Sequence, residues 1–276
     1  MTPRCSRLVR SQGGDFVPAD LSRGRPTNIA ASMPGSVAFV CAMPMELRPL
    51  RRRLSLEKGR VGSFVVYRGS LDGRSMVAIA TGMGARLAIE GLERLVEAIE
   101  VGRIIVVGIT GGLSAETAIG TLVLPEVVVS AATGAEFRPD PLGSGRPNGK
   151  MWTSDELVTD AAVIAELRAD GVVALDMETA AIAEACAARH IPWSVFRAVS
   201  DHACDASLDD EMFGLINPNG SFRPLAVAAY FARHPGCVPT MIRIFQDAKL
   251  AAERAAAAAV AAVAQPLATG AAPQET

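Results

Sequence analysis

The sequence predicts a single-domain α/β fold with a mixed, mostly parallel twisted sheet that is flanked by helices. Two observations support this prediction. Fully apolar segments such as 37–42 and 104–108 alternate along the chain with segments of helical period. Strands that are apolar on both faces are typical of parallel sheets with helices on both sides. Residues 36–250 show neither an internal repeat nor a linker composition, so one domain accounts for them.

The expected elements follow one another in a regular order. The apolar run 37–42 precedes a segment of helical spacing at 45–54 that carries a basic face. Residues 64–70 and 75–80 are rich in β-formers and are separated by a Leu-Asp-Gly-Arg turn of hairpin type. The later elements are a helix at 85–99, strands at 104–108 and 121–130, a loop at 131–150, a strand at 151–155, a helix at 160–168, a strand at 172–175, an alanine-rich helix, and a strand at 193–199.

The two ends of the chain differ from its centre. Residues 1–35 are polar and lack the apolar or amphipathic run of a targeting peptide, so we expect a disordered extension, or a translation start at Met33 instead of Met1. Residues 222–250 read as a pair of amphipathic, basic-apolar helices within the domain 36–250. We expect them to pack on the sheet or on a second subunit, with a lipid-facing or partner-facing role as the alternative. Residues 251–276 predict an alanine-rich helix and a frayed tail.

Composition restricts the classes of function. Half of the residues are hydrophobic and the formal net charge is −2, which argues against a nucleic-acid-binding surface. No apolar run is long and continuous enough to predict stable membrane insertion. The five cysteines are scattered and the three histidines lack metal-ligand spacing. Together these observations predict a cytoplasmic protein with free thiols and with neither a metal nor an organic cofactor.

Two carboxylates follow neighbouring predicted strands. Met177-Glu178 comes after the strand 172–175, and Ser200-Asp201 comes after the strand 193–199. Open α/β sheets build their ligand sites at these strand ends. A carboxylate can accept hydrogen bonds from two vicinal hydroxyls, so Glu178 suits a ribose, and Met177 offers the sugar an apolar surface. The alternative is that Glu178 is a buried acid that only caps the following helix. We assign no role to Asp176, and we interpret His202 and Cys204 as residues of the loop that follows Asp201.

Two turns earlier in the chain are further candidates. Glu46 follows the first strand, where it can act as a general base or serve only as an acid in the first turn of a helix. The turn Thr81-Gly82-Met83-Gly84 lies between a strand and a helix. Its glycines let the backbone approach an anion or a hydroxyl, and the helix start supplies free N–H groups, although a purely structural turn has the same sequence. The glycines of 108–113 are interpreted chiefly as architectural.

These motifs, in this order over residues 36–215, resemble the purine nucleoside phosphorylase/nucleosidase superfamily, and most of all its methylthioadenosine/S-adenosylhomocysteine nucleosidase branch. The Asp-Met-Glu motif before a helix of small residues is the most specific of them. The resemblance implies a nucleoside phosphorylase-like fold in a homodimer or larger ring that takes part in methionine salvage. It also implies hydrolysis of the N-ribosidic bond of an adenine nucleoside, with release of adenine.

The resemblance also implies roles for individual residues. Glu46 matches the base that activates water, and the turn at 81–84 lies beside the ribose C1′ in the family. Asp201, following Ser200, matches the acid that protonates the purine so that it leaves as a neutral base. The segment 152–158 resembles the one whose backbone reads the purine edge. In it Leu157, which precedes Val158, replaces an aromatic residue of the family.

Alternative functions stay open at this point. Arg86, beside the glycine turn, keeps a phosphorylase possible, whereas an anionic Glu46 would repel phosphate. The segment 213–251 looks more like the tail of the phosphorylases of hopanoid biosynthesis, whose substrate is an adenosyl lipid. A nucleoside-binding protein without turnover is the third possibility. The sequence does not indicate the 5′ substituent of the substrate.

Overall fold

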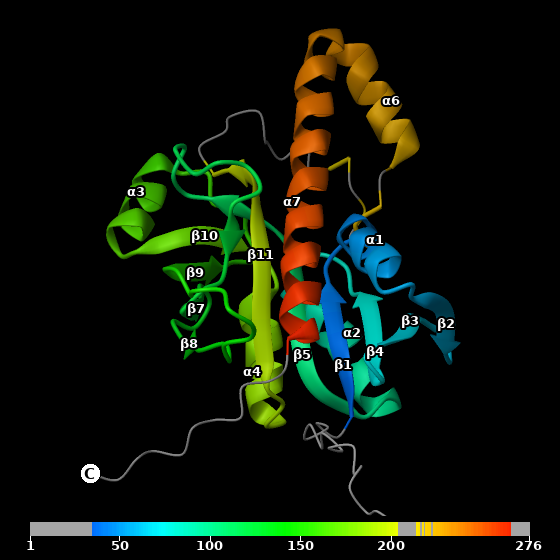
Figure 1. The fold of residues 1–276 in the computed structure, drawn as a ribbon. Helices are drawn as coiled ribbons and strands as arrows, with labels where there is room; N and C mark the ends of the chain where they lie inside the picture. The colour runs from blue at the N-terminus through cyan, green and yellow to red at the C-terminus, as the bar shows by residue number, and fades with distance from the viewer. Residues whose placement is uncertain (1–34, 204–213, 216, 218, 222, 266–276) are drawn as a thin grey trace, which may run out of the picture. The chain divides into compact units, whose positions relative to one another are not determined.

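The computed structural model describes residues 35–203 and 214–265, except 216, 218 and 222, and these residues belong to one compact unit. Their strands form one 11-stranded sheet in the order β2-β3-β4-β1-β5-β10-β9-β7-β8, and β11 pairs with both β5 and β6 (Figure 1). The pairs β1–β4, β1–β5, β5–β11, β9–β10 and β7–β9 are parallel. The other five pairs are antiparallel. The predicted mixed sheet is therefore confirmed, and its longest pairing, between β5 and β11, is parallel.

The first half of the chain builds one side of the sheet, from the edge strand β2 to the central strand β5. Its elements are β1 (Ser36–Cys41), α1 (Pro44–Arg53), β2 (Glu57–Val61), β3 (Phe64–Leu71), β4 (Arg74–Ala80), α2 (Ala85–Ala98) and β5 (Val101–Gly112). The predicted hairpin is present, because β3 and β4 are antiparallel on either side of the turn. Sequence analysis missed β2, since this mostly exposed edge strand has the polar sequence Glu-Lys-Gly-Arg-Val without apolar alternation.

The second half adds shorter strands and the remaining helices. They are β6 (Leu122–Val123), β7 (Val127–Ser130), β8 (Glu136–Phe137), β9 (Lys150–Thr153), α3 (Ala161–Ala169), β10 (Val172–Asp176), α4 (Thr179–Ala188), β11 (Trp193–His202), α6 (Pro224–Arg233), the 3₁₀ helix η1 (Pro235–Cys237) and α7 (Val238–Ala264). The strand predicted at 121–130 is two strands, and the break between them contains Pro125, which has no N–H to donate to a ladder.

The predicted ends of two central strands were wrong in a way that matters for the site. β5 continues past Gly108 to Gly112, and β11 continues past Val199 to His202. Between Val199 and Asp201 the register of β11 against β5 shifts by one residue, which makes Ser200 the extra residue of a bulge. Bulges re-aim side chains and are frequent beside active sites. Asp201 therefore lies on a strand and not in the loop after it.

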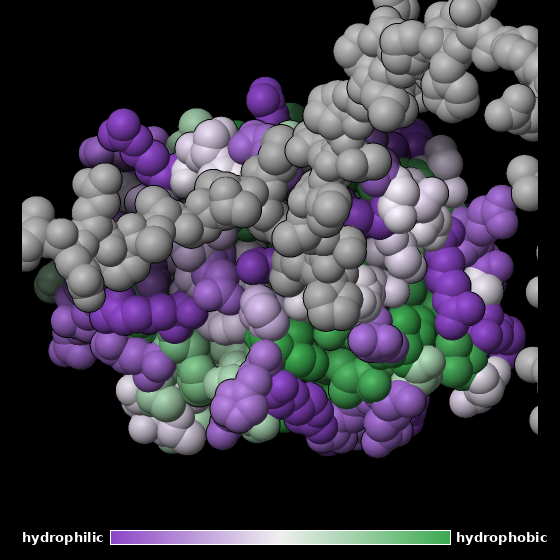
Figure 2. Space-filling model, turned by 60° about the horizontal axis from the view of Figure 1, so that its bottom comes forward, coloured by the Kyte–Doolittle hydropathy of each residue, from purple (hydrophilic) through white to green (hydrophobic). Residues whose placement is uncertain are grey.

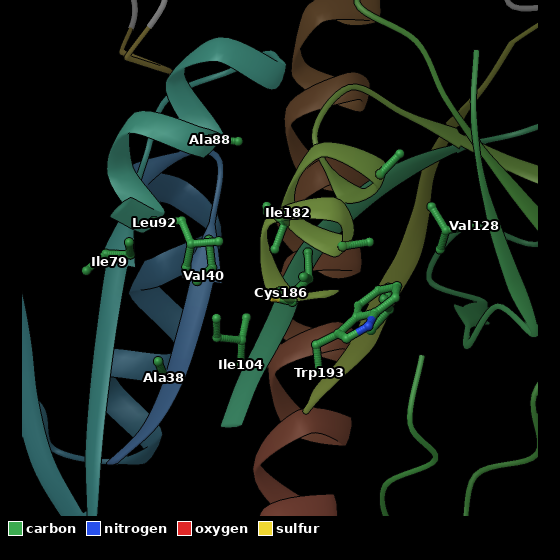
Figure 3. Packing of buried hydrophobic residues seen from close by; sticks show 14 of the residues in the cluster. Ala38, Val40, Ile79, Ala88, Leu92, Ile104, Val128, Ile182, Cys186 and Trp193 are labelled. Carbon is green, nitrogen blue, oxygen red and sulfur yellow. The ribbon is translucent and has the colours of Figure 1, made fainter. Parts of the chain in front are cut away.

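Helices cover both faces of the sheet. On one face, α2 and α4 pack against the central strands, and Figure 3 shows Leu92, Ile182 and Cys186 beside Val40 and Ile104. On the other face α1 and α7 form a second hydrophobic cluster with β1, β5 and β11. α7 runs without a break across residue 250, where we expected a boundary, and its alanines let it approach the sheet closely. Its buried alanines are Ala248, Ala251, Ala252, Ala255, Ala256, Ala259 and Ala262.

The first part of α7 and all of α6 extend beyond the sheet as a helical hairpin (Figure 1). A small cluster around Leu215, Tyr230 and Met241 packs within it. Other apolar side chains of the hairpin face solvent, with Leu225 86% exposed and Ile242 52% exposed. No helix among the described residues has the length and apolarity needed to cross a membrane.

The strand beginnings and the strand ends present different surfaces. Figure 2 brings forward the lower end of Figure 1, where β1 begins, and shows hydrophobic side chains gathered in one area with hydrophilic ones around it. The parallel strands finish at the other end of the sheet, where open α/β sheets build their ligand sites.

Candidate active site

A cleft of about 900 Å³, including its open mouth, lies at the carboxyl ends of the central strands. It brings together most of the predicted site residues, from segments far apart in the chain. The predicted residues in its lining are Glu46, Leu157, Val158, Met177, Glu178, Ser200 and Asp201, and the further residues include Met43, Met83, Thr110, Asp176, Arg197 and His202.

Three of the predicted residues do not line the cleft. Thr81 turns its hydroxyl to the carbonyls of Cys41 and Gly82, at 3.3 and 3.0 Å. The backbone N–H groups of Thr81 and Gly82 donate to the carbonyls of Cys41 and Ala42, both at 2.9 Å. Gly84 contributes indirectly, since its N–H donates to Glu178. The turn therefore ties β1, α2 and Glu178 together, and Met83 alone of its four residues lines the cleft.

The Glu46 carboxylate is buried, with an exposed fraction of 1%. Its Oε2 accepts a hydrogen bond from the Met43 N–H and its Oε1 accepts one from the Ile109 N–H, both at 2.8 Å. The bond from Met43 caps α1, so Glu46 is an acid in the first turn of a helix. This does not prevent it from also acting as a general base. Burial raises the pKa of this carboxyl group, against the opposing effect of the Arg197 charge. A buried carboxylate with a raised pKa has the properties of a general base.

Glu178 is buried at the junction of β10 and α4. Its Oε1 accepts a hydrogen bond from the Gly84 N–H at 2.8 Å, and its Oε2 lies 3.4 Å from Nη2 of Arg197. Burial raises its pKa to about 7; the Arg197 charge opposes this rise and the Asp176 charge adds to it. Glu178 thus combines a raised pKa with a position in the wall of the cleft.

Sequence analysis missed Arg197, which lies at the centre of the charged cluster. Its side chain projects from β11 and is 2% exposed. Nη1 lies 3.6 Å from Oε1 of Glu46, and Nη2 lies 2.6 Å from Oδ2 of Asp176. Burial lowers the pKa of Arg197, but the charges of three surrounding carboxylates raise it by more, so the guanidinium stays charged. The missed signal was an arginine in the middle of an otherwise apolar strand, because a buried charge requires charged partners.

Gly108 provides the space in which Glu46 and Arg197 meet. A Cβ at this position would lie 2.3 Å from Oε1 of Glu46 and 2.5 Å from Nη1 of Arg197. Heavy atoms do not approach this closely without a bond or a strong hydrogen bond. The glycine expected to be architectural is thus required by two charged side chains of the site.

Asp201 and His202 end β11 at the wall of the cleft. The Ser200 hydroxyl donates to Oδ1 of Asp201, and Gly111 leaves space beside Oδ2. We expected His202 to be a loop residue; it lies in the strand instead. Its Nε2 is 2.8 Å from the Thr117 carbonyl, so Nε2 must carry the proton in this contact. Cys204, the other expected loop residue, lies outside the described residues.

The backbone N–H groups at the start of α2 donate to acceptors within the protein. Oδ1 of Asp155 accepts from the Ala85 N–H at 2.9 Å, next to the bond from Gly84 to Glu178. Of the five backbone N–H groups of residues 81–85, four therefore have acceptors within the protein. Arg86 is 75% exposed, pairs with Glu90 and does not line the cleft. Among the described residues, no group of three or more His, Cys, Asp and Glu side chains could hold a metal ion.

Comparisons with known proteins agree with this architecture. The family model of the phosphorylase superfamily matches residues 36–146 and 145–233. The chain belongs to the phosphorylase superfamily. This membership confirms the resemblance inferred from the sequence motifs and the expectation of an enzyme.

Individual members of the superfamily resemble the chain at moderate identity. The 5′-methylthioadenosine/S-adenosylhomocysteine nucleosidase of Actinobacillus succinogenes is 27% identical over 195 residues, which cover 60% of this chain and 85% of the relative. The crystal structure of the Neisseria meningitidis enzyme of that name, in complex with methylthio-immucillin-A, superposes with a TM-score of 0.60 at 23% identity. The matched region covers 83% of this chain and 98% of the Neisseria chain. Futalosine hydrolase of Helicobacter pylori has the same TM-score at 15% identity, and the matched region covers 83% of this chain and 97% of the hydrolase chain.

Proposed function

We propose that the protein is a nucleosidase that hydrolyses the N-ribosidic bond of an adenine nucleoside and releases adenine. The observation that carries this proposal is the meeting of Glu46 and Glu178 around Arg197, with Asp201 in the wall of the same cleft. Superfamily membership and the nucleosidases among the relatives support it. The 5′-methylthioadenosine and S-adenosylhomocysteine class is the first candidate for the substrate.

Each carboxylate has a separate role in the proposed reaction. Asp201 donates a proton to the purine, so that the electrons of the broken C1′–N bond end on a neutral base. Glu178, as an anion, accepts hydrogen bonds from the ribose hydroxyls. Glu46 takes a proton from the water that attacks C1′, and its raised pKa suits this transfer. Met177 presents its thioether to the sugar, and Leu157 and Val158 contact the base from the wall of the cleft.

Water is the nucleophile that the site favours over phosphate. A phosphate dianion needs free N–H donors and cationic side chains. Here the donors of Thr81, Gly82, Gly84 and Ala85 already have acceptors, two of which are carboxylates. Arg197 is surrounded by three carboxylates, and Arg86 points into solvent. For this reason a phosphorylase, including one that acts on an adenosyl lipid, is the second candidate function.

The test is release of free base from a panel of nucleosides by the purified protein. The panel contains 5′-methylthioadenosine, S-adenosylhomocysteine, adenosine and inosine, with the Asp201→Asn variant as the control for contaminating activity. Adenine from at least one adenine nucleoside, absent with the variant, supports the proposal. Base release from inosine alone would contradict the adenine specificity. Tight binding of a nucleoside without release of base would make the protein a nucleoside-binding protein.

Two wider features of the proposal rest on the resemblance. We propose that the protein acts in the cytoplasm, as a homodimer, on a nucleoside of methionine salvage. Size-exclusion chromatography with light scattering measures the assembly directly: twice the mass of the 28.8 kDa chain supports a dimer, and the mass of one chain contradicts it.

A further inference from the structure

Both oxygens of the Asp176 carboxylate are bound by other groups of the protein. Its Oδ1 accepts from the Thr153 hydroxyl at 2.6 Å, and its Oδ2 accepts from both the backbone N–H and the hydroxyl of Thr179. These bonds anchor the carboxylate to β9 and to the first turn of α4. Its strongest ionic partner is Nη2 of Arg197, at 2.6 Å.

The distances around Arg197 show which carboxylate holds it. The same guanidinium lies 3.4 Å from Glu178 and 3.6 Å from Glu46. The contact with Asp176, at 2.6 Å, is the shortest of the three. Because charge-assisted hydrogen bonds are strongest below about 3 Å, it is also the strongest of the three. Nη1 is fixed on the other side by the Ile109 carbonyl at 3.1 Å. Asp176 thus secures the cation, while Glu46 and Glu178 stay at longer range.

We propose that Asp176 is a positioning residue, which holds the Arg197 guanidinium between Glu46 and Glu178 so that both carboxylates are oriented for the reaction. This inference rests on the proposed hydrolysis for its role in turnover. The placement of the cation itself follows from the geometry. Without Asp176, Arg197 would move toward Glu178 or Glu46 and would pair with one of them.

The charge of Asp176 also acts on its neighbours. The groups that face this cluster are Cys41 from β1, Glu46 from α1, Glu178 between β10 and α4, Arg197 and Asp201 from β11, and Asp155 beside the start of α2. The Asp176 charge raises the pKa of Glu178, and it also competes for the Arg197 cation that lowers it. Removing the charge should therefore lower the pKa of Glu178.

The main experiment compares Asp176→Asn with the wild type and with Asp170→Asn, an exposed aspartate that pairs with Lys150 away from the cleft. We expect kcat for the best nucleoside to fall about ten- to a hundredfold in Asp176→Asn. We also expect the acidic limb of its kcat/KM profile to move to lower pH. Asp176→Glu, which restores the charge, should return the limb toward the wild-type position. An acidic limb that is the same in all four proteins would overturn the inference.

A second measurement decides the inference without turnover. Glu178 has a pKa of about 7 in the folded protein and 4.5 as an ordinary carboxyl group, so the folded state retains its proton as pH rises between these values. The wild type should then lose stability from Glu178 between pH 5 and 7. In Asp176→Asn this loss should be smaller, as measured by urea unfolding at each pH. If the wild type releases no base, the proposed function fails, and an unchanged slope in the variant contradicts the inference independently.

Discussion

The backbone N–H of Gly84 donates to Oε1 of Glu178 at 2.8 Å, across 94 residues of chain. This bond joins the first residues of α2 to the carboxylate that we propose for ribose binding. In a phosphorylase, the same helix start would be a site for phosphate. Here Glu178 and Asp155 occupy two of its donors, so that negative charge from the protein replaces the negative charge of a ligand.

Replacing Asp201 by asparagine should impair turnover more than binding. Asparagine keeps the size of the side chain and its bond to Ser200, but it has no proton to give to the purine. General acid catalysis contributes about 10²–10⁴-fold, and we expect kcat to fall within that range. Steady-state kinetics and calorimetric binding of a nucleoside check this prediction. A variant with near-normal kcat would remove Asp201 from the role.

Replacing Glu46 by glutamine should remove activity and also reduce stability. Both carboxylate oxygens accept backbone hydrogen bonds, from Met43 and Ile109, and an amide offers only one oxygen. One buried N–H then lacks its acceptor, which costs about 1–3 kcal/mol. Urea unfolding and kcat/KM measure the two effects. The matched control is Glu57→Gln on the exposed edge strand β2, where neither quantity should change. Equal stability of both variants would contradict the described hydrogen bonds.

The pH dependence of kcat/KM should show an acidic limb near pH 7. Glu178 has its pKa raised to about 7, and only its ionised form accepts hydrogen bonds from both ribose hydroxyls. As pH falls through 7 the carboxylate gains a proton, so kcat/KM should decrease about tenfold for each unit below that pH. Glu178→Gln should lose this limb together with most of the activity. A wild-type profile that is flat down to pH 5 would contradict the assignment.

Replacing Gly108 by alanine should disrupt the packing of Glu46 against Arg197. In Gly108→Ala the added carbon would overlap Glu46 and Arg197, which are both buried and cannot move aside freely. Overpacking of this kind costs about 1–3 kcal/mol of stability, and we expect activity to be lost with it. Gly236→Ala is the control, since a Cβ there meets nothing within 4 Å. Thermal unfolding and base release measure both variants; wild-type behaviour of Gly108→Ala would show that the cluster can rearrange.

Much of the fold follows from apolar periodicity, and the exceptions have physical causes. The buried central strands and amphipathic helices were predictable because each has a clear apolar pattern. The edge strand β2 has none, because it is mostly exposed. The extension of β11 to His202 depends on its pairing with Gly111 and Gly112, a tertiary contact that local sequence does not encode. The same holds for α7, whose alanines are buried only because α7 packs against the sheet.

Site residues were predictable where a reactive side chain also stands in a recognisable position of the sequence, such as the end of a strand. Glu46, Glu178 and Asp201 were found as acids after strands, and the structure places all three in one cleft. Arg197 was missed and Asp176 was given no role, because their importance lies in their mutual distance of 2.6 Å, which no spacing in the chain reveals. Thr81 and Gly82 were expected at the ligand, but their polar groups bond to β1 and to the turn itself.

The central claim is that water, activated by Glu46, attacks the ribose. The most direct measurement is the reaction of the wild-type protein with 5′-methylthioadenosine with and without inorganic phosphate, with the sugar product identified by mass spectrometry. We predict free 5-methylthioribose, formed at the same rate with or without phosphate. A strict requirement for phosphate, with 5-methylthioribose 1-phosphate as the product, would contradict the claim and identify the protein as a phosphorylase.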